Sequence, residues 1–167
     1  MTDLSVRERL QPALLDRLSD DAPDDKQESR EMRTISQQKL RAAVLRDLTW
    51  LFNAIRPSDR IDWESAPEAE RSVINFGLPP LSGETASTLN IVELESRIRR
   101  AIVDFEPRID PSSIRVQAIL SEVALNQHNQ IQLEIHGDLW SQPIPIELLL
   151  HTEFDLETGQ VQIRDLA

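Results

Sequence analysis

The spacing of apolar residues changes from a helical period in the first two thirds of the chain to strict alternation in the last third. The longest helical stretch runs from about residue 36 to residue 54, and Pro57 follows it as a stop signal. Its predicted buried face consists of Leu40, Val44, Leu48, Leu51 and Ile55, widened by Ala43, Trp50 and Phe52.

Two further helices are predicted between residues 65 and 105. Ser65, Pro67 and Glu68 form the pattern of a capping box with proline in the first turn, so we expect a short helix that ends at Gly77. A third helix is expected from about residue 88 to residue 105, with Ser87 or Thr88 as its N-cap. Its predicted apolar stripe consists of Ile91, Leu94, Ile98, Ala101, Ile102 and Phe105.

Beyond Pro111 apolar and polar residues alternate, which is typical of half-buried strands. Strands are expected at about 114–120, 131–136 and 146–155, and a turn near Gly159 returns the chain into a last short strand. The order of elements predicts an α+β fold, with helices packed on one face of a small, mainly antiparallel C-terminal sheet. The apolar positions of the last hairpin include Ile146, Leu148, Leu150, Val161 and Ile163.

The N-terminal segment has a separate character. Its apolar residues recur every four positions, as on one side of a short helix, and the acidic stretch 19–30 that follows is typical of a solvated linker. We therefore divide the chain into an N-terminal amphipathic segment with its linker, 1–30, and an α+β domain, 31–167. The stripe either folds back on its own domain or docks on a partner. It consists of Val6, Leu10, Leu14, Leu15 and Leu18.

Composition excludes several classes of function. The chain has 18 basic and 29 acidic residues, a formal net charge of -11, which argues against binding to nucleic acid or to an anionic membrane surface. Cysteine is absent, so disulfides and thiolate metal sites are ruled out. No apolar run approaches the roughly 20 residues that span a bilayer, and no signal peptide is recognisable. We expect a cytoplasmic protein without membrane insertion.

No catalytic constellation stands out. No Glu or Asp has the spacing of a metal site around His128, His136 and His151, and the chain contains no phosphate loop, nucleophile elbow or dinucleotide fingerprint. Glycoside hydrolysis needs two facing carboxyl groups, for which Glu106 beside Asp104 is the most interesting candidate among many acidic residues. We expect no enzyme activity, no metal and no cofactor.

The triplet Glu106, Pro107 and Arg108 is more informative. Pro107 disfavours helical geometry at Glu106, so the preceding helix should end there. Proline also stiffens the backbone between an acidic and a basic side chain, and Arg108 can bind a carboxylate or carbonyl groups with its planar fork. Two interpretations stay open: a local salt bridge that closes a helix-to-strand connection, or a rigid charged corner that contacts a partner.

Four blocks of sequence resemble the TssE family, the baseplate subunits of the type VI secretion system, which are similar to wedge proteins of contractile phage tails. The blocks are RDLTWLFNA at 46–54, RSVINFGLP at 71–79, AIVDFEPRI at 101–109 and LLDRLSDD at 14–21. Each block alone is weak, but their order and spacing are specific. Phe76 stands where many relatives have tyrosine, which should preserve packing and lose only a hydroxyl group.

The resemblance implies a structural adaptor between the baseplate wedge and the contractile sheath. Its Glu-Pro-Arg signature, matched by Glu106, Pro107 and Arg108, implies contact with the wedge subunits TssF and TssG, and indirectly with TssK. The resemblance also implies that strands of the TssB–TssC sheath pair with an edge of this chain's sheet, at the terminal hairpin. Leu14, Leu15 and Leu18 are expected to dock on a neighbouring subunit. Two alternatives are a lysozyme-like peptidoglycan hydrolase and the wedge protein of a phage tail or related particle.

Overall fold

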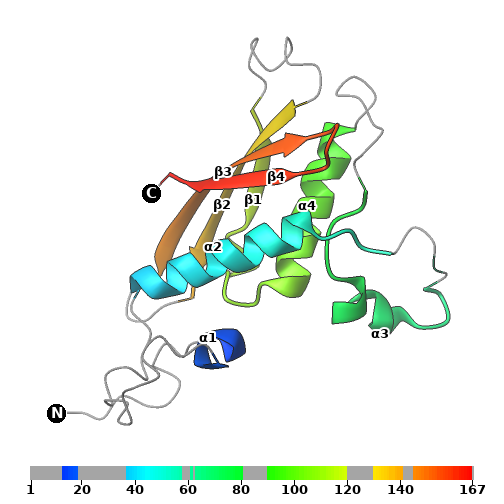
Figure 1. Ribbon diagram of the computed structural model, residues 1–167, viewed down its shortest axis with the longest axis horizontal. Coiled ribbons are helices and arrows are strands. Elements are labelled where there is room, and N and C mark those ends of the chain that lie inside the picture. The colour runs from blue at the N-terminus through cyan, green and yellow to red at the C-terminus, as the bar shows by residue number, and fades with distance from the viewer. Residues whose placement is uncertain are drawn as a thin grey trace.

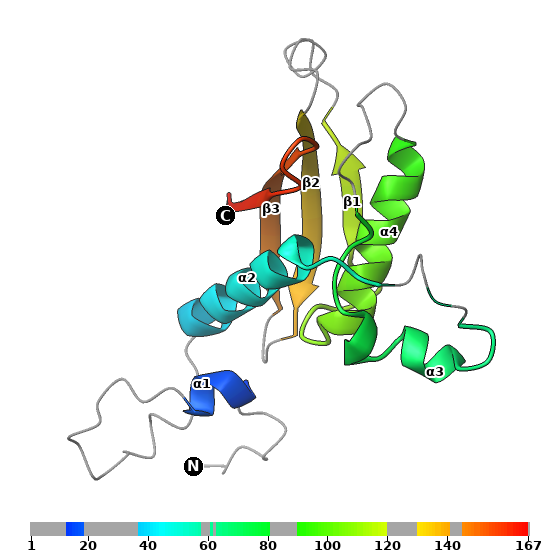
Figure 2. The same cartoon turned by 45° about the vertical axis from the view of Figure 1, so that its right-hand side comes forward.

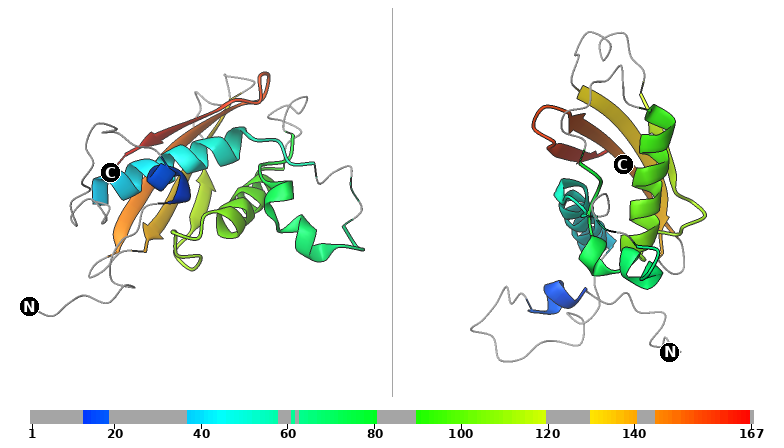
Figure 3. Two further views of the ribbon diagram at one scale, coloured as in Figure 1. Left: turned by 60° about the horizontal axis from the view of Figure 1, so that its bottom comes forward. Right: turned by 90° about the vertical axis from the view of Figure 1, so that its right-hand side faces the viewer.

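The structure of the protein is a computed structural model, which describes residues 13–18, 37–57, 61, 63–80, 90–119, 130–140 and 145–166. Two long helices, α2 (Gln37–Asn53) and α4 (Ile91–Phe105), lie on one face of a four-stranded sheet. Figure 1 shows α2 crossing the sheet and α4 running beside β1. The turned views in Figure 3 place both helices on the same side of the sheet, which confirms the predicted α+β arrangement.

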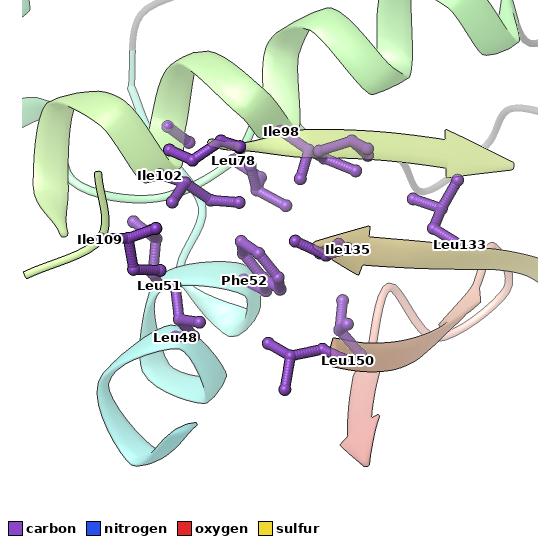
Figure 4. Close-up of a cluster of buried hydrophobic side chains, with 14 of the residues drawn as sticks. Leu48, Leu51, Phe52, Leu78, Ile98, Ile102, Ile109, Leu133, Ile135 and Leu150 are labelled. Carbon is purple, nitrogen blue, oxygen red and sulfur yellow. The ribbon is translucent and has the colours of Figure 1, made fainter. Parts of the chain in front are cut away.

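The sheet is an antiparallel meander in which each strand pairs with the next. Its order is β1 (Arg115–Ala118), β2 (Gln130–Leu139), β3 (Ile146–Asp155) and β4 (Val161–Asp165), so β1 and β4 are its edges. Alternation places one set of side chains against the helices, as the sequence predicts. Figure 4 shows this core between the two layers, and Figure 2 shows α4 lying along β1. Residues 120–129, including His128, lie outside the described residues.

Helix α2 buries most of its predicted face, but two predicted core residues are exposed. The buried residues are Leu40, Ala43, Val44, Leu48, Leu51 and Phe52. Ile55 is 72% exposed because the helix ends at Asn53, so the helical spacing no longer applies to it. It forms an isolated parallel bridge with Leu78 instead. Trp50 is 51% exposed, and its ring packs under the guanidinium group of Arg46 at 5.1 Å.

Helix α4 begins two or three residues later than the sequence predicts. Its N-cap is Asn90, whose side chain accepts a hydrogen bond from the main chain of Glu93, so the expected caps Ser87 and Thr88 were wrong. These two residues lie outside the described part of the chain. The helix ends at Phe105, as predicted, and Glu106 is its C-cap. Its buried stripe is Leu94, Ile98, Ala101 and Ile102.

The single helix expected from residue 65 to Gly77 is wrong. The structure has a short helix, α3 (Pro67–Glu70), and a separate 3-10 turn, η3 (Val73–Asn75). Ala66 is the N-cap of α3 and provides no side-chain hydrogen bond, so the capping box is absent. The chain then turns at Ser72, whose hydroxyl caps η3 by accepting from Ile74.

The predicted boundary between 1–30 and 31–167 falls outside the described residues, as do Val6, Leu10 and the linker 19–30. Of the N-terminal segment, the structure describes α1 (Leu14–Leu18). No helix among the described residues has both the length and the apolar character needed to cross a membrane.

Candidate docking site: the Glu106–Arg108 corner and the sheet edges

The backbone of the segment 106–110 is fixed between α4 and the end of β2. The main-chain N–H of Glu106 donates to Ile102 as the helix ends, and Trp140 donates to the carbonyl of Arg108 over 2.8 Å. Asp110 donates to the carbonyl of Asp138, also over 2.8 Å. Together with exposed Pro107, which restricts the backbone, these bonds make the segment a rigid corner. We call Glu106, Pro107 and Arg108 the corner.

Both carboxylate oxygens of Glu106 are used within the chain. Glu106 is only 2% exposed. Its Oε1 accepts from the Arg108 Nε at 2.6 Å and from the Arg108 main chain at 3.2 Å, while Oε2 accepts from Nη2 at 2.5 Å. A buried carboxylate needs such partners because desolvation would otherwise be costly. Of the two interpretations, the structure therefore shows the local salt bridge; contact of the corner with a partner stays a prediction.

Arg108 is less buried than Glu106 and has a second acidic partner. Its Nη2 donates to Asp47 Oδ2 on α2 over 2.6 Å, and its side chain is 24% exposed. Burial lowers the pKa of Arg108, but the hydrogen bond and charge of Glu106, followed by those of Asp47, outweigh burial and raise this pKa above its usual value. Arg108 is therefore a permanent cation. No described residue accepts a hydrogen bond from its Nη1.

Two neighbouring side chains of α2, Arg46 and Asp47, connect the corner with α1. Arg46 donates through Nε to Asp47 Oδ1 at 2.9 Å and through Nη1 to Asp16 Oδ1 at 2.6 Å. Its pKa is raised above the usual value by the hydrogen bonds to Asp16 and then to Asp47. Arg46 and Asp47 were not among the site residues predicted from the sequence, although both lie in the block 46–54 that carries the family resemblance.

The apolar residues of α1 are not buried by the described part of the chain. Leu14 and Leu18 are each 74% exposed, and Leu15 is 43% exposed. Helix α1 contacts α2 through its acidic residue Asp16 instead. The structure thus shows an intrachain contact for the polar side of α1, while docking of its leucines on a partner stays a prediction.

The outer edge of β4 is blocked at one end by a side chain of α2. Asn53 accepts from the main-chain N–H of Val161 through Oδ1 at 2.9 Å and donates to its carbonyl through Nδ2 at 3.0 Å. Main-chain hydrogen bonds join Gln160 to Asp155 and Leu166 to Leu149. The even-numbered residues of β4 therefore direct their N–H and C=O groups toward β3, and the odd-numbered residues direct theirs outward. The main chain of Ile163 therefore points outward, and no described residue hydrogen-bonds to it.

The outer edge of β1 is covered by α4. Glu95 accepts from the main-chain N–H of Ala118 at 2.7 Å, and Arg99 donates to the carbonyl of Ile114 at 3.3 Å. These two bonds occupy outward-facing groups on either side of Val116. At both edges, then, helix side chains occupy some of the outward-facing groups, and the outward-facing main chains of Val116 on β1 and Ile163 on β4 lie between the occupied positions.

The structure places the predicted hairpin residues in different environments. Leu148 and Leu150 are fully buried in the core, and their strand β3 lies between β2 and β4. Their side chains and main chains are thus occupied, which excludes a direct contact with an added strand. Ile146 lies on the same inner strand, whereas Val161 and Ile163 lie on the edge strand β4.

The described residues include no group suited to metal binding, and the carboxyl pair considered for glycoside hydrolysis is engaged in ion pairs. No group of three or more His, Asp or Glu side chains among them has the geometry of a metal site. His136 and His151 lie on the polar face of the sheet, each within 3.5 Å of a glutamate two residues away in its own strand. A glycosidase acid must reach the substrate and hold a proton, but Glu106 is buried against Arg108, and Asp104 lies 3.5 Å from Arg71.

Comparison with known proteins gives one family match. The model of the family described as baseplate wedge protein gp25 matches residues 38–144, about two thirds of the chain. The match includes α2, α4 and the corner, and it ends before β3. No curated protein and no solved structure matches the chain significantly.

Proposed function

The chain belongs to the family of baseplate wedge protein gp25, and from this premise we propose that it is the TssE-type adaptor of a type VI secretion system. Membership of this family supports a structural role in a baseplate of the phage-tail type. The narrower assignment rests on the resemblance of the four sequence blocks to TssE. One of them, residues 14–21, lies outside the family match and favours a secretion system over a phage tail.

In this proposal the corner binds the helical core formed by the wedge subunits TssF and TssG, and through them contacts TssK indirectly. The observation that carries the proposal is the geometry of Arg108. Glu106 and Asp47 hold two of its nitrogens, so that its charge is fixed in place while Nη1 is left for an acceptor on a partner. A prearranged guanidinium group loses little conformational entropy on binding, which makes it effective at an interface.

The opposite task, attachment to the TssB–TssC sheath, is assigned to the edge of β4. Ile163 presents an outward-facing main chain there, in the terminal hairpin to which the family resemblance assigns strand addition. An extended segment of a sheath subunit would add to β4 through main-chain hydrogen bonds. The chain is thus expected to act without chemical turnover, as a connector in the cytoplasm.

Co-purification with TssF and TssG tests the role of the corner. Replacing Arg108 alone would leave a buried carboxylate unpaired and so destabilise the fold. The paired substitution Glu106→Gln with Arg108→Gln removes both charges together, so no buried carboxylate is left unpaired, and we expect a folded protein that no longer co-purifies. Arg97→Gln is the matched control, because Arg97 pairs with Glu93 on the surface of α4.

Unchanged co-purification of the paired variant would refute the role assigned to the corner. Circular dichroism of both variants would show that the comparison is between folded proteins. Clearing of peptidoglycan by the purified chain, lost on Glu106→Gln, would instead support the hydrolase alternative.

A further inference from the structure

Five side chains of alternating charge connect three segments that are distant in the sequence. They run from Asp16 through Arg46, Asp47 and Arg108 to Glu106, and the hydrogen bonds between successive members measure 2.6, 2.9, 2.6 and 2.5 Å. The steps from Asp16 to Arg46 and from Asp47 to Arg108 span 30 and 61 residues of sequence. We call this set the ion-pair chain.

The central members of the ion-pair chain are shared between their neighbours. Asp47 binds Arg46 with Oδ1 and Arg108 with Oδ2, so each oxygen has its own arginine. Arg46 also lies over the ring of Trp50, which restricts its side chain. Because the next residue, Leu48, is fully buried, Asp47 sits on a part of α2 that the core holds in place. A change at Asp47 should therefore affect both ends of the chain.

Helix α1 depends on this contact for its position. A helix of five residues is not stable by itself in water. Leu14 and Leu18 are each 74% exposed, so their apolar surface contributes little to holding α1 against α2, while Leu15 is 43% exposed. Among the described residues, the ion pair between Asp16 and Arg46 joins α1 to α2.

We propose that Arg46 and Asp47 are positioning residues that join α1 and the corner into one binding surface. Leu14 and Leu18 lie four residues apart and so project from one side of α1, which is the pattern that packs on another helix. Arg108 adds a fixed guanidinium group whose Nη1 donates to no described residue. We therefore commit to one occupant, a helix of the wedge partner that carries an apolar stripe beside a hydrogen-bond acceptor. This inference rests on the function proposed above.

The first experiment needs no partner. Because the chain has no cysteine, Leu18→Cys provides a single site for a nitroxide label, whose motion is read by electron paramagnetic resonance. We expect a restricted label on the otherwise unchanged chain and a mobile label when Arg46→Gln or Asp47→Asn is added. Arg97→Gln, which removes a surface pair on α4, should leave the label restricted. Equal mobility in all four proteins would overturn the proposal.

The second experiment measures affinity for the TssF–TssG complex. Asp47→Asn should weaken binding about tenfold, and so should Leu14→Ala combined with Leu18→Ala. If the leucines of α1 and the corner form one surface, the effects of the two changes on affinity should overlap. The protein that carries Asp47→Asn, Leu14→Ala and Leu18→Ala together should then lose much less affinity than the product of the two separate losses predicts. Additive losses, or an affinity of Asp47→Asn within about twofold of the unchanged chain, would overturn the inference while the proposed function stands. Absence of binding by the unchanged chain would instead refute the proposed function.

Discussion

Asn53 pairs with both main-chain groups of Val161, as a peptide group of a neighbouring strand would. Its Oδ1 and Nδ2 lie 2.9 and 3.0 Å from the nitrogen and oxygen of Val161, and Nδ2 also donates to Thr49 within α2. A helix side chain thereby closes the first outward-facing position of an edge strand. Such protection is one way in which proteins prevent edge-to-edge association.

Removal of this side chain should loosen the join between α2 and β4. Asn53→Ala loses both hydrogen bonds to Val161. Because the site is exposed, water can hydrogen-bond to the freed groups, and we expect the free energy of unfolding to fall by only about 1–2 kcal/mol. Asn53→Asp retains the acceptor but places a charged oxygen against the carbonyl groups of Val161 and Thr49 at the C-terminal end of α2, so its loss should be at least as large. Urea denaturation followed by circular dichroism measures both changes. Equal stability of all three proteins would show that the pair contributes nothing.

Gly77 is required by its backbone conformation and by its surroundings. Its φ angle is +122°, and a Cβ atom at this position would lie 2.3 Å from the carbonyl oxygen of Ala54. Gly77→Ala should lower the free energy of unfolding by more than about 2 kcal/mol, because the clash is with backbone. Gly159, with a φ of +72° and no atom near its added Cβ, provides the comparison.

Gly159→Ala should cost about 1 kcal/mol, the effect of a positive φ angle alone. Thermal unfolding of the two variants tests the difference. A larger loss at Gly159 than at Gly77 would contradict the assigned contact with Ala54.

The fold was largely predictable because apolar spacing determines which face of each element is buried. The periods of 3.6 and 2 predicted α2, α4 and all four strands. The errors lie where a tertiary contact replaces the local pattern. Ile55 continues the helical spacing but follows the helix end, and Ser65 fits a capping pattern although the chain begins α3 from Ala66.

The candidate site was predictable only in its local part. Glu106 and Arg108 are two residues apart, so their pairing could be weighed from sequence. The partners that fix them in the molecule could not, because Asp47 is 61 residues from Arg108 and Asn53 is 108 residues from Val161. A hydrogen bond between distant residues has no periodic signal. Similarity of the block 46–54 to a family was the one indication that these positions matter.

The turn between β3 and β4 should weaken in acid. Main-chain N–H groups of Thr158 and then Glu157 donate to Asp155 and lower the pKa of this carboxyl group below its usual 3.8. A depressed folded pKa means that ionised Asp155 stabilises the fold at pH values above its unfolded pKa. This stabilisation is lost as the pH falls through the lower folded value.

Nuclear magnetic resonance of the Asp155 carboxyl carbon should give a midpoint below 3.8. The urea midpoint should also fall less between pH 6 and pH 3 in Asp155→Asn than in the unchanged chain. Glu147→Gln is a suitable control, because Glu147 is an exposed carboxylate elsewhere on β3. An Asp155 midpoint at or above the usual value would contradict the assigned hydrogen bonds.

Alternation along β4 allows strand addition to be separated from folding. The N–H of Ile163 points away from β3, so Ile163→Pro removes a donor from the outer edge and leaves the ladder with β3 in place. The N–H of Gln162 points toward β3, and Gln162→Pro should therefore destabilise the hairpin itself. Urea denaturation should rank Gln162→Pro as the less stable of the two.

Binding to assembled TssB–TssC sheath, measured by co-sedimentation, should be lost in Ile163→Pro and retained in Ile163→Ala. The alanine variant controls for the partly buried side chain, since it shortens Ile163 without removing its N–H. Loss of binding in both variants would mean that the side chain rather than the main chain carries the contact. Retained binding in Ile163→Pro would move sheath attachment away from the edge of β4, because a strand cannot pair with a donor that has been removed.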